Sequence, residues 1–155
     1  MKQLHEHMTT YNTDDEKFMR AAIDEARKAE MRDEVPIGAV IVCNKQIIAR
    51  AHNLTETLTD PTAHAEMQAI TSATSYLGGK YLTDCTLYVT VEPCLMCAGA
   101  IAWSQMKRVV FGAADDKRGY HTYCANPFHK KTEIVAGVLA DECGSIVTDF
   151  FRRKR

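Results

Sequence analysis

TLYVTVEPCLMCAGAIAWS, residues 86–104, changes its hydrophobic pattern halfway along. The first part, Thr86 to Val91, is rich in β-branched and aromatic side chains, which is typical of a strand. Pro93 follows at a position suited to a helix start, because the first helical residue needs no backbone N–H. Residues Cys94 to Ser104 then predict a short helix. The stretch therefore predicts a strand that leads directly into a helix carrying a Cys-x-x-Cys pair at its start.

The flanking sequence continues this alternation. Apolar spacing predicts a helix from Thr13 to about Arg32, opened by a capping box of Thr13 and Glu16. Two apolar segments separated by Asn44-Lys45 predict a hairpin. The expected elements are strands over 37–43, 46–52, 86–91, 108–112 and 133–136, helices over 13–32, 62–76, 94–104 and 139–152, and a loop over 113–131. We therefore expect an α/β fold, a three-layer α-β-α sandwich around a five-stranded mixed sheet.

Length and composition fit one globular domain spanning residues 1–155. Hydrophobic residues make up 46% and charged residues 25% of the chain, which excludes a disordered or coiled-coil protein. The sequence has no apolar run near the roughly 18 residues of a membrane span and no secretory signal at its start. We expect a cytoplasmic protein with no membrane association, a flexible N-terminus over 1–12 and a basic tail over 152–155.

The distribution of charge bears on whether the protein binds nucleic acid, and the cysteines are interpreted from their surroundings. The net charge of −1 argues against a strongly basic nucleic-acid binder, but from Lys107 onward ten Lys/Arg face only six Asp/Glu. This excess indicates either an RNA-facing surface or solvated charges with a frayed tail. Cys43, Cys85 and Cys143 lie in apolar segments and are interpreted as core thiols, whereas Cys124 has no assignment.

His64, Cys94 and Cys97 are the candidate metal ligands. Each is expected at a helix start that follows a strand or loop, and such starts gather at one edge of an open α/β sheet. Imidazole and thiolate ligands suit zinc, and three protein ligands leave one tetrahedral position for water. Zinc brings the pKa of such a water towards ~7, and Glu66 is placed to move protons beside it.

Other interpretations of these residues remain open. A lone histidine is most often structural, and a Cys-x-x-Cys pair also occurs in redox sites and zinc knuckles. Cys124 or His129 could supply a fourth ligand and close the site. In that case the chain would be a structural-zinc RNA-binding module without catalysis.

The combined pattern is more specific. His64-Ala65-Glu66 followed by Pro93-Cys94-Leu95-Met96-Cys97 resembles the cytidine deaminase superfamily of zinc-dependent nucleobase deaminases. The segments 35–40, 60–66, 86–94, 109–113 and 139–143, with the ending Phe150-Phe151-Arg152, resemble the branch that deaminates adenosine in tRNA. The resemblance implies a cytidine deaminase-like fold and hydrolytic conversion of adenosine to inosine at the wobble position of a tRNA anticodon loop. The same zinc residues would also serve a deaminase of free guanine, cytidine or adenosine.

The resemblance also implies residue roles. His64, Cys94 and Cys97 would bind one Zn²⁺ per subunit, and Glu66 would be the general acid and base. The remaining implied roles are hydrogen bonding to the nucleoside by Asn53, packing on the flipped base by Ile37, and RNA-backbone contacts by Asp115, Lys117 and the C-terminal basic cluster that includes Arg152. Their alternative interpretations are a turn cap for Asn53, a core position for Ile37 and solvated charges for the others.

Two further features concern RNA and assembly. The segment Gly119 to Thr132 is shorter than expected for this branch and departs from its pattern, although its aromatic residues Tyr120, Tyr123, Phe128 and His129 could stack on unpaired bases. Family resemblance implies a homodimer. The apolar residues Ile101, Trp103 and Met106 beside the Cys-x-x-Cys helix could pack on a partner or in the core.

Overall fold

The computed structural model describes residues 13–155, which form one five-stranded sheet in the order β2-β1-β3-β4-β5. β1 runs antiparallel to β2 and β3, whereas β3, β4 and β5 are parallel, so the sheet is mixed as expected. The strands are β1 Gly38–Cys43, β2 Gln46–His52, β3 Cys85–Val91, β4 Arg108–Ala113 and β5 Glu133–Ala136. The segment expected to be flexible, residues 1–12, lies outside the described residues.

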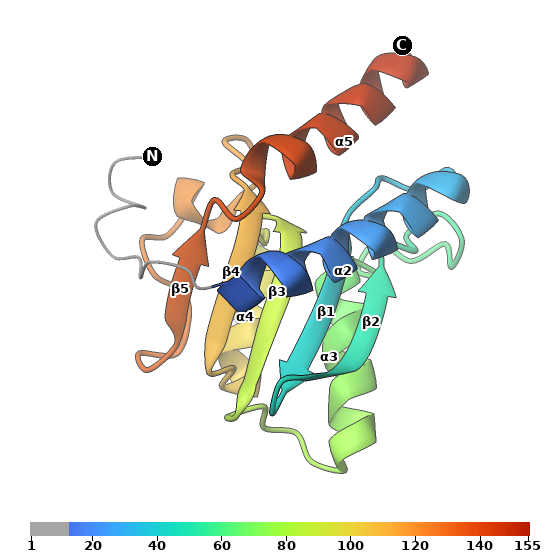
Figure 1. Ribbon diagram of the computed structural model, residues 1–155. Helices are drawn as coiled ribbons and strands as arrows, with labels where there is room; N and C mark the ends of the chain where they lie inside the picture. The colour runs from blue at the N-terminus through green and yellow to red at the C-terminus, as the bar shows by residue number, and fades with distance from the viewer. Residues whose placement is uncertain (1–12) are drawn as a thin grey trace.

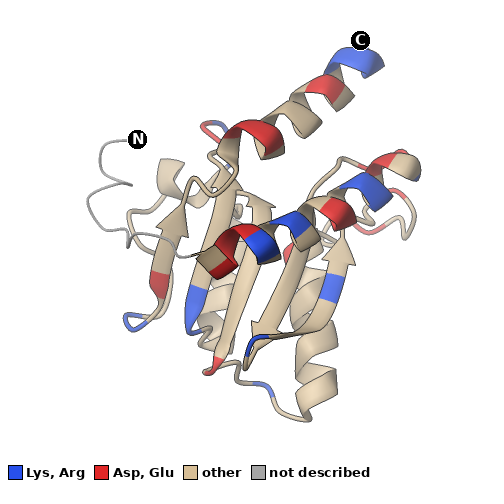
Figure 2. Cartoon of the chain, in the orientation of Figure 1, with Lys and Arg blue, Asp and Glu red and all other residues tan. Residues whose placement is uncertain are grey.

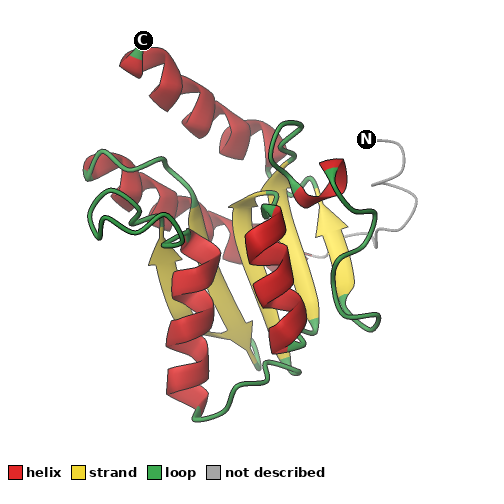
Figure 3. Ribbon diagram, turned by 180° about the vertical axis from the view of Figure 1, so that it is seen from behind, coloured by secondary structure: helices red, strands yellow, loops and turns green. Residues whose placement is uncertain are grey.

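In residues 13–155, four helices cover the sheet on both sides. α2 (Thr13–Met31) and α5 (Ala140–Lys154) lie over one face, and α3 (Ala65–Leu77) and α4 (Leu95–Ser104) lie over the other (Figure 1 and Figure 3). The three-layer α-β-α prediction is therefore confirmed.

Alternating side chains along the strands produce two separate cores. In β1, Ala39 and Ile41 pack beneath α3 and α4, whereas Val40 and Val42 pack beneath α2 and α5. This follows from the period of two along a strand, and it explains why β1 is apolar without interruption. A hairpin joins β1 to β2, and both residues of its Asn44-Lys45 turn have positive φ, as a two-residue hairpin requires.

Two helix boundaries differ from the sequence prediction by more than one residue. The second helix was expected from Thr62 but begins at Ala65, because the Asp60 carboxylate accepts hydrogen bonds from the Thr62 N–H and Oγ1, each at 2.8 Å. These hydrogen bonds stabilise a turn at residues 60–62, so the helix starts only after this turn. The closing helix extends to Lys154 rather than Arg152, so the basic C-terminus is helical except for Arg155.

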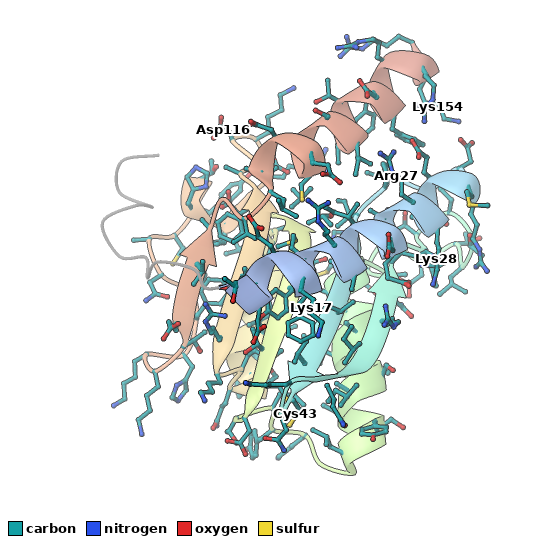
Figure 4. The ribbon with its side chains drawn as sticks, viewed as in Figure 1. Lys17, Arg27, Lys28, Cys43, Asp116 and Lys154 are labelled. Atoms are coloured by element: carbon teal, nitrogen blue, oxygen red, sulfur yellow. The ribbon has the colours of Figure 1, made fainter. Side chains whose placement is uncertain are left out.

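One edge of the sheet collects the candidate functional segments. β2, β3 and β4 run in the same direction, so His52, Val91 and Ala113 all end at this edge, where α3 and α4 begin (Figure 3). Asp116 in the loop after β4 marks this end of the molecule, and Cys43 marks the opposite end (Figure 4). Within residues 13–155, no helix combines the length and apolarity needed to cross a bilayer.

Candidate metal centre and active site

His64 and Cys94 are the N-cap residues of α3 and α4. Both have extended backbone conformations, with φ of −71°, and neither side chain caps its own helix. Their carbonyl groups instead open the two helices by accepting hydrogen bonds from Gln68 and Ala98. The side chains are therefore free to point away from the helix axes, towards the space between the two N-termini.

The ligand atoms of His64, Cys94 and Cys97 converge in this space. His64 Nδ1 lies 3.6 Å from the Cys94 sulfur and 3.5 Å from the Cys97 sulfur. A tetrahedral zinc ion, about 2.1 Å from nitrogen and 2.3 Å from sulfur, places such atoms roughly 3.5 Å apart. The donor set and its spacing thus fit zinc. Within residues 13–155 these three form the sole cluster of metal-ligand type, and Cys124 is exposed and outside it.

The electrostatics of the centre favour a thiolate. Hydrogen bonds from Cys97 and then His64 lower the pKa of Cys94 to about 4, although burial opposes this shift. The positive end of the α4 dipole acts in the same direction. The Cys97 thiol donates its hydrogen bond to Cys94, which raises the pKa of Cys97. Zinc would therefore have to displace one proton from Cys97 when it binds.

Glu66 lies beside this cluster in the first turn of α3. Its side chain is buried and forms a hydrogen bond with Cys97. Burial raises the pKa of Glu66 to about 7, so the carboxyl group can both accept and release a proton near neutral pH. The first-turn geometry that general acid-base chemistry requires of Glu66 is present.

Asn53 and Ile37 are neighbours at the end of the β1–β2 hairpin. The Asn53 side chain accepts a hydrogen bond from the Thr55 N–H at 3.2 Å, and its amide group donates to the Val35 carbonyl at 3.4 Å. Asn53 therefore caps a turn, as its alternative interpretation stated. Ile37 is half-buried against the core beneath α3 and α4.

An open hollow of about 480 Å³ adjoins the cluster at Cys94. Its lining joins the start of α4 to the loop after β4 and consists of Cys94, Leu95, Met96, Lys117, Arg118 and Tyr123. Asp115 is outside this lining, but its carboxylate accepts hydrogen bonds from the backbone N–H groups of two lining residues, Lys117 and Arg118. Of the residues expected to contact RNA, Lys117 thus lies at the hollow and Asp115 shapes its rim.

The C-terminal basic cluster lies on α5 and is largely ion-paired. Arg153 pairs with Glu30 at 2.8 Å, and Lys154 pairs with Asp33, so ion pairs join the end of α5 to the end of α2 and the residues after it. Figure 2 shows the basic end of α5, and Figure 4 labels Lys154 there. Arg152 is exposed and its guanidinium lies 3.4 Å from the Asp149 carboxylate. These contacts correct the frayed-tail interpretation. Arg152 does not line the hollow beside Cys94.

Two aromatic residues of the 119–132 segment were interpreted wrongly. Tyr120 and Phe128 are buried and pack edge to face, with ring centroids 4.8 Å apart, so they cannot stack on RNA bases. Tyr123 is exposed at the hollow, and His129 is partly exposed. The segment contains a short 3-10 helix, η1 (Tyr120–Thr122), which turns Tyr120 into the core.

Three residues near the centre were not predicted from the sequence to be functional: Glu92, His121 and Arg118. Glu92 is a buried carboxylate between β3 and Pro93, and His121 Nδ1 lies 2.6 Å from it. The sequence signal for Glu92 was an acidic residue between a buried strand and a helix start, where an unpaired charge would be costly.

A His-Cys-Cys centre with a buried glutamate, set on a three-layer α-β-α sandwich, defines the class of zinc-dependent deaminases. Residues 12–113 match the family described as the cytidine and deoxycytidylate deaminase zinc-binding region.

Comparison with individual proteins refines this class. The chain is 51% identical over 148 residues to the tRNA-specific adenosine deaminase of Bacillus subtilis (strain 168), covering 92% of each chain. It matches a solved tRNA:A34 deaminase that edits A to I at the wobble position of transfer RNA, with a TM-score of 0.79 and 41% identity over 84% of this chain and 98% of that one. A guanine deaminase structure from Bacillus subtilis matches with a TM-score of 0.62 and 42% identity, over 67% of this chain and 66% of that one. The chain belongs to the family of tRNA-specific adenosine deaminases.

Proposed function

We propose that the protein hydrolyses adenosine to inosine at the wobble position of a tRNA anticodon loop. The observation that carries this proposal is the convergence of His64, Cys94 and Cys97 beside the buried Glu66, in a chain of this family. In the reaction, the bond from C6 of adenine to its amino nitrogen breaks, a C6–O bond forms from water, and ammonia leaves. An unpaired loop base can enter a recessed site at low cost, which suits this substrate.

Each residue of the centre has a distinct role in this proposal. His64, Cys94 and Cys97 would hold one zinc ion per subunit, and that ion would supply Lewis-acid activation of water at neutral pH. Glu66 would take a proton from the attacking water and deliver a proton to the departing amino nitrogen. Its pKa near 7 suits both transfers.

Asn53 and Ile37 are proposed to hold the target nucleoside. One N–H of the Asn53 amide is directed to Val35, and an amide has two, so the second remains to donate to the nucleoside. The half-buried Ile37 side chain offers an apolar surface for a flat base. The turn that Asn53 caps would then fix the direction of its remaining donor.

RNA-backbone contacts are proposed for Lys117, with Asp115 fixing the turn that presents it. The Asp115 carboxylate accepts hydrogen bonds from the backbone N–H groups of Lys117 and Arg118, so its proposed contribution is to stabilise the turn that carries Lys117. Arg152, on the exposed side of α5, would contact phosphates further along the stem.

The test is deamination of a short anticodon stem-loop RNA with a wobble adenosine, compared with free adenosine, cytidine and guanine. We expect inosine in the stem-loop and little turnover of the free compounds. Turnover of a free compound alone would instead support a nucleobase or nucleoside deaminase, the alternative favoured by the match to guanine deaminase. RNA binding without any turnover would support the structural-zinc module.

A homodimer in the cytoplasm is proposed as the working state. Trp103 on α4 is 84% exposed, and with Tyr81 and Ile70 it lines a mostly apolar hollow between α3 and α4. Ile101 and Met106, by contrast, are buried in the core. All six cysteines are free thiols, which accords with a reducing compartment. Light scattering should give twice the chain mass of 17.4 kDa, and Trp103→Glu should yield a monomer; a monomeric unmodified protein would reject the dimer.

A further inference from the structure

The Glu92 carboxylate is a buried anchor at the end of β3. No part of this side chain is exposed, and its neighbour along the chain, Pro93, leads into the metal ligand Cys94. The carboxylate accepts hydrogen bonds from the Asp115 N–H at 3.0 Å, the His121 N–H at 3.0 Å and the His121 ring nitrogen Nδ1 at 2.6 Å. All three donors come from the loop after β4, so the buried charge is satisfied by that loop.

Further contacts fix the same loop to the start of α4. The Tyr120 N–H donates to the Pro93 carbonyl at 2.9 Å, and Gly119 forms an isolated β-bridge with Cys94. Gly119 lies so close to the anchor that a Cβ atom there would be 2.3 Å from the Glu92 carboxyl carbon. The loop is therefore fitted closely around Glu92, with room for only glycine at the point of contact.

The segment held in this way carries the cations of the hollow. Lys117 and Arg118 lie between the Asp115 and His121 attachment points, and both line the hollow next to Cys94. Both side chains are exposed, and neither has an acidic partner in the ion pairs formed by residues 13–155. Two such cations at the rim of a deaminase centre suit the phosphates on either side of a flipped nucleotide.

We propose that Glu92 and His121 are positioning residues that hold residues 115–121 so that Lys117 and Arg118 meet the RNA phosphates flanking the target adenosine. This inference rests on the proposed function and deepens it, because it assigns the rim of the hollow to the RNA backbone. The His121 ring joins the loop to Glu92 through Nδ1, and its other ring nitrogen lies 3.7 Å from the exposed Asp116 carboxylate. The irregular loop of this chain is thus organised around a Glu92–His121 pair.

Two variants and one control test the positioning role. His121→Ala removes the ring donor to Glu92, and Gly119→Ala forces the loop away from Glu92 without removing any donor. Asp116→Asn is the matched control, since it alters only the exposed outer partner of His121. For each protein we would measure zinc content, kcat and KM on the anticodon stem-loop, and amide hydrogen exchange over residues 113–123.

We expect both loop variants to retain zinc and to keep kcat within about twofold, while KM rises by on the order of tenfold, the effect of losing about one charge-assisted contact. Exchange over 113–123 should accelerate in both variants and stay normal in Asp116→Asn. Two outcomes would contradict the positioning role without contradicting the proposed function. One is faster exchange with an unchanged KM, and the other is a loss of kcat together with a loss of zinc. No turnover of the stem-loop by the unmodified protein would overturn the proposed function and this inference together.

Discussion

Glu66 is buried and lies next to the Cys97 sulfur. These two properties determine how a substitution at Glu66 should change turnover. Glu66→Gln preserves the shape of the side chain but cannot transfer a proton. We expect turnover to fall by roughly 10²- to 10⁴-fold, the usual contribution of general acid-base catalysis. Zinc content, measured by atomic absorption, should stay at one per subunit. Full activity in this variant would remove Glu66 from the mechanism.

Glu34 is a second buried carboxylate, and its role is structural. It accepts hydrogen bonds from the Glu56 N–H at 3.0 Å, the Thr57 N–H at 2.6 Å and the Thr57 hydroxyl at 2.6 Å, and so holds the loop between β2 and α3. Burial alone would raise the pKa of Glu34, but these hydrogen bonds outweigh it and lower the pKa below the unperturbed 4.5.

The lowered pKa of Glu34 predicts a dependence of stability on pH. A carboxyl group with a lower pKa in the folded state stabilises the fold above its unfolded pKa, and this contribution is lost as the pH falls below about 4.5. We expect Glu34→Gln to lower the free energy of unfolding at pH 7 by about 2 kcal/mol and to flatten its decline in acid. Urea unfolding between pH 3 and pH 7 measures both effects. Glu56→Gln, an exposed change in the same loop, is the control and should behave like the unmodified protein.

At the scale of elements, the two helix starts explain how the site is built. His64 and Cys94 both occupy N-cap positions, and neither side chain forms a capping hydrogen bond. Their side chains therefore converge with that of Cys97 between the starts of the two helices. Sequence spacing was sufficient to predict this convergence, because parallel strands end at one edge and each is followed by a helix. The exact start of α3 was not predictable in the same way, since it depends on how the Asp60 side chain bonds to Thr62.

α2 packs so closely on β1 that there is no space for a side chain at Gly38. A Cβ atom on Gly38 would lie 2.0 Å from the Ala22 carbonyl oxygen and 2.4 Å from the Ala26 backbone nitrogen. Because backbone cannot rotate away as a side chain can, Gly38→Ala should lower the free energy of unfolding by about 3 kcal/mol.

Gly144→Ala is the matched control for this effect. Gly144 lies within α5, and an added Cβ would make an ordinary contact of 3.6 Å with Ala113. Alanine is favoured over glycine in a helix by about 1 kcal/mol, so this variant should be as stable as the unmodified protein or more so. Thermal unfolding of the two variants side by side provides the measurement. Equal stability of both would show that α2 can shift away from the sheet at little cost.

At the scale of the whole molecule, periodicity predicted the layers but not the interior of the long loop. The alternation of strands and helices after an initial hairpin was sufficient to predict a mixed sheet with helices on both faces. Tyr120 and Phe128 lie in a polar segment without periodicity, and only packing against Phe111 reveals that they belong to the core. For the same reason Glu92 and His121 were missed, since their pairing joins residues 29 positions apart.

Zinc removal tests how the metal centre is coupled to the fold. Among the described residues, the two core clusters contain none of the ligands His64, Cys94 and Cys97, and both extend across the sheet. We therefore expect a chelator to abolish deamination and to lower the melting temperature by roughly 10 °C, while leaving a folded protein. Circular dichroism in the far ultraviolet should keep its helix and strand signal, and added zinc should restore both activity and melting temperature. Cys94→Ser should already have the lowered melting temperature and should not respond to the chelator. Complete unfolding on chelation would instead indicate that the ion holds α3 and α4 on the sheet, as expected for a structural zinc site.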